Sequence, residues 1–232
     1  MNKCLTRAAC ILLIVALWAA GTGQARAQEL TVSAGSAILM DRESRRILWE
    51  KNIHQTRPVA SVTKIMTALL ALELGEEQEQ VVVSPQAART EGSSIWLEQG
   101  EKKTLEELIY GLMLCSGNDA AVAIAEHLAG SVEGFASLMT CKARQLGAVN
   151  TYFVNPHGLP DDRHYSTAYD LALISCQALD NQRFRNIVST DCRIITRPGN
   201  LEGRFLNNQN RLLELYSGAD GIKTGWTKNA GR

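Results

Sequence analysis

The chain has 232 residues, of which 45% are hydrophobic, and its 24 basic and 24 acidic side chains give a formal net charge of zero. This length suits one domain with a sizeable core. Phosphate binding requires clustered Lys and Arg, and because the sequence contains no such cluster, a nucleic-acid partner is not expected.

The N-terminus predicts a secretory signal peptide over residues 1–27. Lys3 and Arg7 precede an apolar run from Ala8 to Ala20, and Ala25-Arg26-Ala27 offers a small-residue cleavage site. The run is short for a membrane span. We therefore expect cleavage after Ala27, export, and a single domain over residues 28–232; an uncleaved anchor is the alternative.

Four cysteines would remain after export: Cys115, Cys141, Cys176 and Cys192. Disulfides persist outside the cytoplasm, but these spacings match no disulfide or metal signature. Cys115 and Cys176 lie in apolar helical patterns. We expect buried free thiols at both positions.

The first folded element is predicted as a β-hairpin over Ser36–Glu50, where two apolar runs flank a polar turn at Asp41–Arg45. Apolar residues then repeat at helical spacing from Val62 to Leu72, and Gly75 marks the end of that helix. Ser61 is therefore expected at a helix N-terminus.

The middle of the chain is predicted to be helical. A capping box at Thr104–Glu107 opens a helix that Ser116-Gly117-Asn118 interrupts, and an Ala-rich helix follows from about Asp119. Further helical patterns cover Val132–Leu146, Thr167–Leu179 and Gln182–Val188, with a turn-rich loop over residues 152–167.

Short extended segments, Arg193–Thr196 and Gly221–Trp226, return near the end of the sequence. A hairpin, a block of helices and then late strands favour an α/β (α+β) fold. We expect an antiparallel sheet with strands from both ends of the chain and a helical subdomain.

Ser61-Val62-Thr63-Lys64 places a hydroxyl and an amine three residues apart, on one face of a helix. A lysine amine can take the proton of a serine hydroxyl if burial or a neighbouring cation lowers its pKa. Taken alone, an N-cap serine followed by a surface lysine has the same pattern.

Two later segments could complete a site. Ser116-Gly117-Asn118 offers a hydroxyl and an amide on a turn between helices. Lys223-Thr224-Gly225 offers a cation and a hydroxyl on an extended segment, whose glycine allows close approach of another backbone. Each is ordinary by itself, but together they supply a nucleophile, bases and substrate-binding groups.

In this order the three segments resemble the S-x-x-K, S-x-N and K-T-G boxes of the penicillin-binding superfamily. The strongest likeness is to its low-molecular-weight D-alanyl-D-alanine carboxypeptidases, and it extends from about Ser36 to the end. It also includes Arg57–Ser61, Asn155–Leu159, His164–Asp170 and Asp220–Lys223. The resemblance implies a β-lactamase/transpeptidase-like fold.

The same resemblance implies acyl transfer, in which Ser61 attacks the bond between two D-alanines of a peptidoglycan stem peptide and water hydrolyses the ester. Lys64 would be the base, Ser116 would relay the proton to the leaving amine, and Asn118 would hold the acyl peptide. β-Lactams would acylate Ser61. No cofactor or metal is implied.

The third box has its own implied roles. Lys223 would supply a positive field that also depresses the pKa of Lys64, and Thr224 would bind the terminal carboxylate beside Gly225. The backbone N–H groups of Ser61 and Trp226 would form the oxyanion hole. We expect this chemistry at the outer face of the bacterial cytoplasmic membrane or in the cell wall.

The four histidines, His54, His127, His157 and His164, are not spaced as metal ligands. His157 is interpreted as a residue that structures its loop.

The sequence departs from the family after the third box, because Arg232 is seven residues past Gly225. Relatives continue with further strands and often an amphipathic membrane anchor. We therefore expect a C-terminally incomplete domain, in which the third box has an unpaired edge. Membrane association would need an anchor that these residues lack.

Two alternatives remain open. A class A-like β-lactamase would share the boxes, but the sequence has no E-x-x-L-N segment, and Gly117 stands where those enzymes usually carry Asp. A catalytically inert product, either peptidoglycan-binding or merely truncated, is the other. The sequence also leaves open whether the stem peptide carries diaminopimelate or lysine.

Overall fold

The computed structural model describes residues 30–231. The chain divides into two units, residues 1–33 and 34–232, and every element below belongs to the second. The predicted signal peptide lies outside the described residues. None of the described helices combines the length and the apolar composition needed to cross a bilayer.

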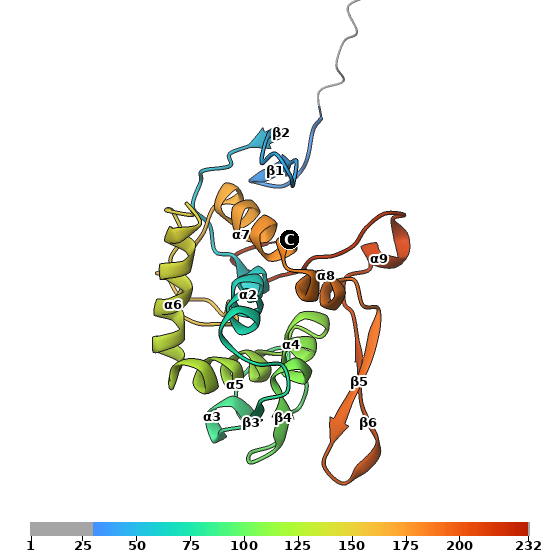
Figure 1. Cartoon of the computed structure of the whole chain (residues 1–232). Helices are drawn as coiled ribbons and strands as arrows, with labels where there is room; N and C mark the ends of the chain where they lie inside the picture. The colour runs from blue at the N-terminus through green and yellow to red at the C-terminus, as the bar shows by residue number, and fades with distance from the viewer. Residues whose placement is uncertain (1–29, 232) are drawn as a thin grey trace, which may run out of the picture. The chain divides into compact units, whose positions relative to one another are not determined.

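Helix α2, Lys64–Leu74, lies at the centre of the helical region (Figure 1). Every residue from Lys64 to Ala71 is buried, as expected for a helix that neighbours cover on all sides. Its neighbours are α4 (Leu105–Leu114), α5 (Asn118–Ala129), α6 (Val132–Gln145), α7 (Ala168–Asp180) and α8 (Gln182–Val188).

The ends of these helices follow their sequence signals. The Thr104 hydroxyl accepts the Glu107 N–H at 3.1 Å, and the Glu107 carboxylate accepts the Thr104 N–H at 3.0 Å. This reciprocal capping box satisfies two N–H groups that a helix start leaves without partners. The predicted bounds of α8 are confirmed, and those of the other long helices agree within a few residues.

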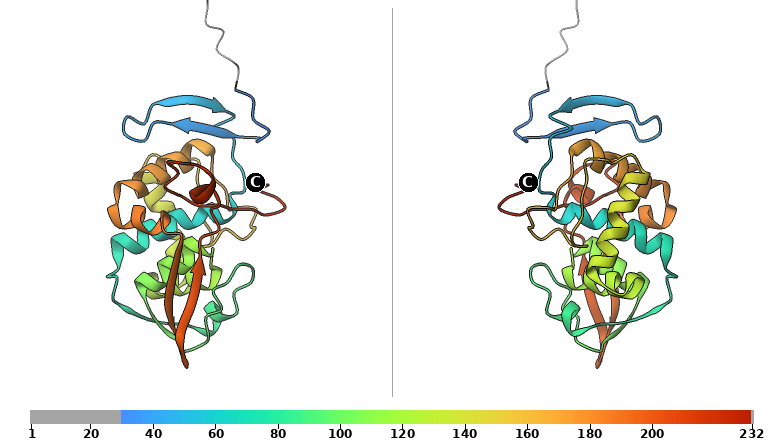
Figure 2. Two further views of the ribbon diagram at one scale, coloured as in Figure 1. Left: turned by 90° about the vertical axis from the view of Figure 1, so that its right-hand side faces the viewer. Right: turned by 90° about the vertical axis from the view of Figure 1, so that its left-hand side faces the viewer.

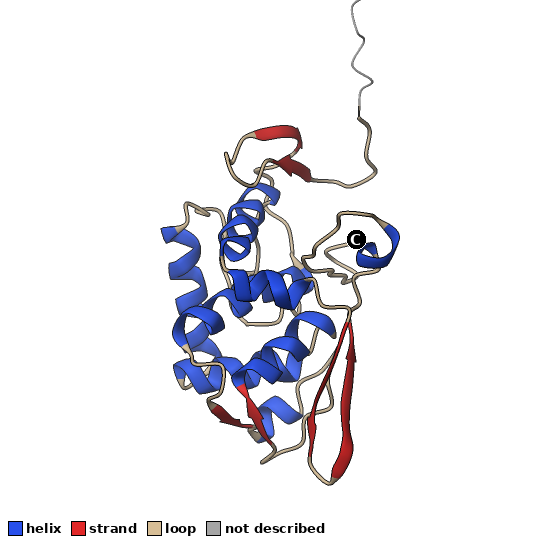
Figure 3. Cartoon of the chain, turned by 45° about the vertical axis from the view of Figure 1, so that its right-hand side comes forward, coloured by secondary structure: helices blue, strands red, loops and turns tan. Residues whose placement is uncertain are grey.

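The strands form three antiparallel pairs: β1 (Ala37–Met40) with β2 (Ile47–Lys51), β3 (Gln80–Val82) with β4 (Lys102–Thr104), and β5 (Cys192–Arg197) with β6 (Asn200–Asn207). They lie around the helices (Figure 3). The first pair packs on α7, and the third packs on α4 (Figure 2). The two short helices are α3 (Pro85–Ala88) and α9 (Leu212–Leu215).

The mixed α/β class and the N-terminal hairpin are confirmed, but the shared sheet is not formed among the described residues. Gly221–Trp226 belongs to no strand. The physical reason is that no described strand lies between this segment and the β1–β2 hairpin, so no hydrogen-bond ladder connects them. Gly221–Trp226 is therefore not part of a sheet in this structure, in line with the unpaired edge expected for the third box.

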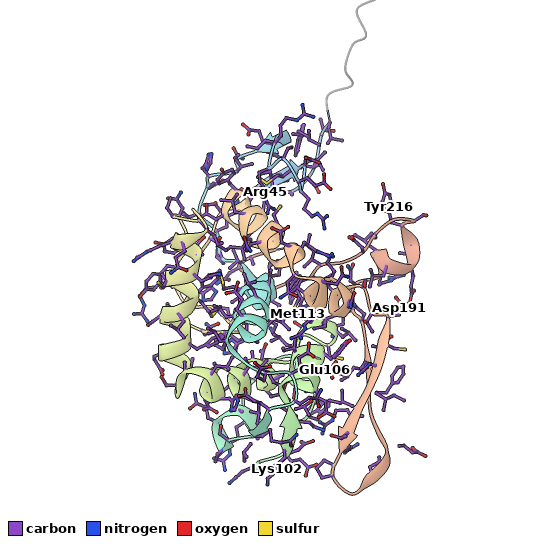
Figure 4. The ribbon with its side chains drawn as sticks, in the orientation of Figure 1. Arg45, Lys102, Glu106, Met113, Asp191 and Tyr216 are labelled. Carbon is purple, nitrogen blue, oxygen red and sulfur yellow. The ribbon has the colours of Figure 1, made fainter. Side chains whose placement is uncertain are left out.

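The core is a single hydrophobic cluster built mainly from α2, α4 and α5. Met113 of α4 is 2% exposed and lies among the helices, whereas Tyr216, after α9, is 68% exposed and points outward (Figure 4). The core thus fixes the two helix ends from which the first and second boxes project.

Candidate active site

Ser61 lies in a 3₁₀ turn, η1, at Ala60–Thr63, which leads directly into α2. Ala60 has a φ of 45°, and the Asn155–Pro160 loop packs against its carbonyl group. Gly158, with a φ of 84°, makes this possible, because a Cβ there would overlap the Ala60 carbonyl oxygen. Ser61 was expected at a helix N-terminus. It lies instead in a 3₁₀ turn that precedes the helix, and Gly158 packs against the backbone of this turn.

Lys64 joins the first box to the second. Its Nζ lies 3.0 Å from Ser61 Oγ, 2.7 Å from Asn118 Oδ1 and 2.8 Å from the His157 carbonyl oxygen. The side chain is 0% exposed. Lys64 has no salt bridge to a carboxylate within the part of the chain that the structure describes. An amine in this position has three fixed polar neighbours and no counter-ion.

Burial lowers the pKa of Lys64 well below its usual value, and the positive charge of Lys223 lowers it further. Asp119 acts in the opposite direction and raises the pKa. The sum favours the neutral amine. Lys64 must be neutral to accept the Ser61 proton, as expected from the sequence.

The second box forms the turn between α4 and α5. Ser116 is 4% exposed and has a φ of 62°, a left-handed conformation that is uncommon outside glycine. Within residues 30–231 its hydroxyl makes no hydrogen bond to Ser61 or Lys64. Asn118 accepts from Lys64, and its Nδ2 donates to the Glu91 carbonyl at 2.6 Å.

The Glu91–Leu97 loop packs against this turn, and sequence reasoning missed it. Buried Asp119 accepts the N–H groups of Ile95 and Leu97 at 3.1 and 3.0 Å. A Cβ at Gly92 would lie 2.6 Å from Asn118 Nδ2, so only glycine allows the loop this close. The only signal of this contact in the sequence was Asp119, the acidic residue directly after the second box.

The third box reaches the first through its backbone. A Cβ at Gly225 would lie 3.1 Å from the amide nitrogens of both Ser61 and Val62. The predicted close approach at this glycine is therefore confirmed. Trp226 follows with its side chain 63% exposed. Over the described residues, the backbone amides of Ser61 and Trp226 donate no hydrogen bond.

Lys223 and Thr224 do not contact the other site residues through hydrogen bonds in residues 30–231. Lys223 Nζ donates to the Thr224 carbonyl at 3.0 Å, and Thr224 is exposed. Burial lowers the pKa of Lys223 to about 8. The amine therefore stays mostly protonated at neutral pH and acts on Lys64 through its field.

The two buried histidines hold loops in place. His157 Nδ1 accepts the Leu159 N–H at 3.2 Å, while the His157 carbonyl accepts from Lys64. His164 Nδ1 accepts the Val154 N–H, so its proton lies on Nε2 and points to Thr63 Oγ1 at 2.8 Å. These contacts are consistent with the interpretation that His157 structures its loop. The hydrogen bond from Lys64 to the His157 carbonyl was not predicted.

The four cysteines of the described part are free thiols. Cys176 is buried as expected, whereas the expectation of a buried thiol at Cys115 is wrong, because this residue ends α4 and is only half-buried; Cys141 and Cys192 are exposed. Among residues 30–231, no group of three or more His, Cys, Asp or Glu side chains could hold a metal ion. A cavity of about 760 Å³ lies beside η1, but Ser61, Lys64 and Ser116 do not line it.

Comparison with known protein families matches residues 23–232 to the D-alanyl-D-alanine carboxypeptidase family. The chain belongs to this family. It is 40% identical over 211 residues to the D-alanyl-D-alanine carboxypeptidase DacF of Bacillus subtilis, covering 88% of this chain and 54% of that protein. A carboxypeptidase from a Streptomyces strain is 34% identical over 238 residues, which cover 94% of this chain and 82% of the relative.

Solved structures of carboxypeptidase-family members agree with the fold. The D-alanyl-D-alanine carboxypeptidase DacD of Francisella tularensis superposes with a TM-score of 0.81 at 29% identity, covering 89% of this chain and 62% of that one. A mutant of a Streptomyces DD-transpeptidase gives 0.82 at 32% identity, over 88% and 84% of the two chains. The chain spans about half the length of the first curated relatives that it matches, 54% and 51%.

Proposed function

We propose that this protein is a serine-type D-alanyl-D-alanine carboxypeptidase that removes the terminal D-alanine from peptidoglycan stem peptides through an acyl-enzyme on Ser61. The observation that carries the proposal is the set of three neighbours around Lys64 Nζ: Ser61 Oγ, Asn118 Oδ1 and the His157 carbonyl. Family membership supports the same reaction.

A neutral lysine amine has two N–H donors and one lone pair. Asn118 Oδ1 and the His157 carbonyl can only accept, so they take the two N–H groups at 2.7 and 2.8 Å. The lone pair is then left for Ser61, whose hydroxyl lies 3.0 Å away and can donate to it. Lys64 is thereby oriented to remove the Ser61 proton as the hydroxyl attacks the substrate carbonyl.

The second box would complete the proton path. Ser116, buried in the turn before α5, relays the proton from Lys64 to the leaving amine. The Asn118 amide group has two N–H donors and uses one on Glu91. The other remains for a carbonyl of the acyl peptide.

The third box would bind the other end of the scissile bond. Gly225 lies against the amide of Ser61, and the Ser61 and Trp226 N–H groups stabilise the developing oxyanion. Loss of one such donor typically costs about 3 to 4 kcal/mol of transition-state stabilisation. Lys223 and Thr224 hold the substrate's terminal carboxylate.

The substrate determines where the protein would act. Peptidoglycan stem peptides occur outside the cytoplasm, and the N-terminal sequence has the pattern of a secretory signal. We place the activity at the outer face of the cytoplasmic membrane or in the cell wall, in peptidoglycan synthesis and the control of cell shape.

Labelled penicillin tests the assignment of the nucleophile. We expect the full-length protein to form a covalent penicilloyl adduct on Ser61 that peptide mass spectrometry locates, and Ser61→Ala to form none. Slow release of the adduct distinguishes a carboxypeptidase from a β-lactamase, which would turn penicillin over. Labelling that persists in Ser61→Ala, or no labelling of the unsubstituted chain, contradicts the proposal.

A further inference from the structure

A groove of about 340 Å³ lies between the Glu91–Leu97 loop and strand β6. Trp96 of the loop and Phe205 of β6 both line it, and their side chains are 77% and 64% exposed. Ser93, whose carbonyl accepts the Asn118 N–H at 2.7 Å, and Cys115, which directly precedes Ser116, line it as well. The groove therefore lies beside the second box, although Ser116 and Asn118 themselves do not line it.

The backbone around Trp96 is fixed on every side. The Asp119 carboxylate accepts the N–H groups of Ile95 and Leu97, which flank Trp96. The Trp96 N–H donates to Ser94 Oγ at 2.8 Å. Trp96 itself has a φ of 60°, a left-handed conformation that is costly for an aromatic residue. The loop thus holds a strained residue whose indole contributes little to the core.

A buried ionic cluster connects this loop to β6. Arg204, the neighbour of Phe205, donates to the Trp96 carbonyl at 2.8 Å and pairs with Glu101 at 3.2 Å. Glu101 also pairs with Lys103 at 3.0 Å, and the Glu101 and Lys103 side chains are both 0% exposed. Because the same guanidinium binds the loop and belongs to β6, the positions of Trp96 and Phe205 are set relative to each other.

We propose that this groove binds the long aliphatic side chain of the stem-peptide residue directly before the two D-alanines, and that Trp96 is a specificity-determining residue. The proposal rests on the proposed function. Asn118 holds the acyl peptide in that function, so the residue that precedes the acyl D-alanine would lie toward Ser93 and Cys115.

The chemistry of the groove fits such a side chain. Both diaminopimelate and lysine carry several methylene groups; those of lysine end in an ammonium, and those of diaminopimelate end in a carbon that bears an ammonium and a carboxylate. The methylenes can pack on the faces of Trp96 and Phe205 while the ammonium stays in water or approaches an aromatic face. One methylene in a hydrophobic pocket is worth roughly 10 to 200-fold in discrimination between substrates. Arg204 already pairs with Glu101, so little free charge remains in the groove.

The test compares three acetylated tripeptides that end in D-Ala-D-Ala and carry lysine, diaminopimelate or alanine at the preceding position. In the full chain, Trp96→Ala should lower kcat/KM about tenfold for the long-chain peptide that the groove accepts, and change it less than about twofold for the alanine peptide. Trp96→Phe should retain the preference. Whether the lysine or the diaminopimelate arm is affected identifies the ligand.

Two measurements keep the result interpretable. The circular dichroism spectrum and the urea unfolding midpoint of Trp96→Ala should match those of the unsubstituted chain, which shows that the variant is folded. Tyr216→Ala, an exposed aromatic substitution outside the groove, should change no substrate ratio. A folded Trp96→Ala variant that shows equal kcat/KM losses for all peptides, or none, overturns this inference alone. An unsubstituted chain that is never acylated overturns the proposed function, and this inference with it.

Discussion

Lys64 and Lys223 are two amines of one site whose environments differ. Lys64 is fully buried with three polar neighbours, while Lys223 is half-buried and donates to the Thr224 carbonyl. Burial lowers the pKa of both, but only Lys64 also experiences a neighbouring cation that lowers it. Lys64 is therefore suited to accept a proton, and Lys223 to carry a charge.

The first prediction separates these roles with the same substitution at two positions. Lys64→Arg should reduce penicillin acylation at least about 100-fold, because guanidinium remains protonated and cannot act as a base. Lys223→Arg keeps the charge and should retain measurable acylation. Stopped-flow acylation rates of both variants check this. Equal loss in the two would show that the roles are not divided in this way.

The second prediction concerns pH. The pKa of Lys223 is lowered to about 8, so its positive charge is present below that pH and disappears as the pH rises through it. The acylation rate should therefore fall above about pH 8. In Lys223→Arg this alkaline decline should move up by more than about one pH unit, since guanidinium does not titrate in the range. A decline at the same pH in both proteins would assign it to another group.

At the scale of elements, the site depends on three backbone segments approaching one another more closely than side chains would allow. The Asn155–Pro160 loop contacts η1 at Gly158, the Glu91–Leu97 loop contacts Asn118 at Gly92, and the third box contacts Ser61 at Gly225. A misplacement of about 1 Å can reduce catalysis on the order of 100-fold. Small residues at these contacts are therefore expected to control the proposed activity.

The third prediction uses two glycines with almost the same backbone conformation. Gly158 has a φ of 84° and Gly147 a φ of 82°, but only at Gly158 would a Cβ overlap a backbone group, the Ala60 carbonyl. Gly158→Ala should lower acylation by about 100-fold. Gly147→Ala should lower the free energy of unfolding by about 1 kcal/mol and leave acylation unchanged.

Acylation rates and urea unfolding of the two variants provide the comparison. Comparable acylation in Gly158→Ala and Gly147→Ala would mean that the loop can retreat from Ala60 without disturbing Ser61.

At the scale of the whole molecule, two buried histidines make stability depend on pH. Burial lowers the pKa of His157 to about 3 and that of His164 to about 4, both from an ordinary value of 6.5. The unfolded chain therefore binds protons that the folded chain does not. Their contribution to stability is complete above pH 6.5 and decreases as the pH falls from there toward 4 and 3.

The fourth prediction follows from that sign. Between pH 7 and pH 5 the free energy of unfolding should decrease by on the order of 2 kcal/mol for each of the two histidines. Urea unfolding at the two pH values measures it. His164→Gln keeps a polar partner for Thr63 but removes one titrating group, so its pH-dependent loss should be about half as large. An unchanged loss in that variant would contradict the assignment.

Local signals in the sequence predicted much of this structure. The capping box at Thr104 and the spacing of apolar residues in α2 act over a few residues, so the helices and the first two boxes could be found. The contacts that hold the site in place join residues far apart in the sequence. Asp119 accepts hydrogen bonds from a loop 22 to 25 residues earlier, and Arg204 donates to the carbonyl of Trp96, 108 residues earlier. No local pattern encodes such contacts.

The strands show the same limit. The β1–β2 hairpin has clear alternating runs and was predicted, whereas β3 and β4 have three residues each and pair across an intervening helix. The expected sheet with strands from both chain ends is absent among the described residues. Strand pairing depends on which strands are neighbours in the tertiary structure, and a local sequence pattern does not show this. The third box nevertheless reaches Ser61 through Gly225.

The central claim is that Ser61, activated by Lys64, releases D-alanine from a stem peptide. The most direct measurement is D-alanine release from an acetylated tripeptide ending in D-Ala-D-Ala, with intact-protein mass spectrometry of the same reaction after acid quenching. We predict D-alanine release by the full chain, an acyl adduct on Ser61, and loss of both signals in Ser61→Ala. Release of D-alanine that continues in Ser61→Ala would contradict the account.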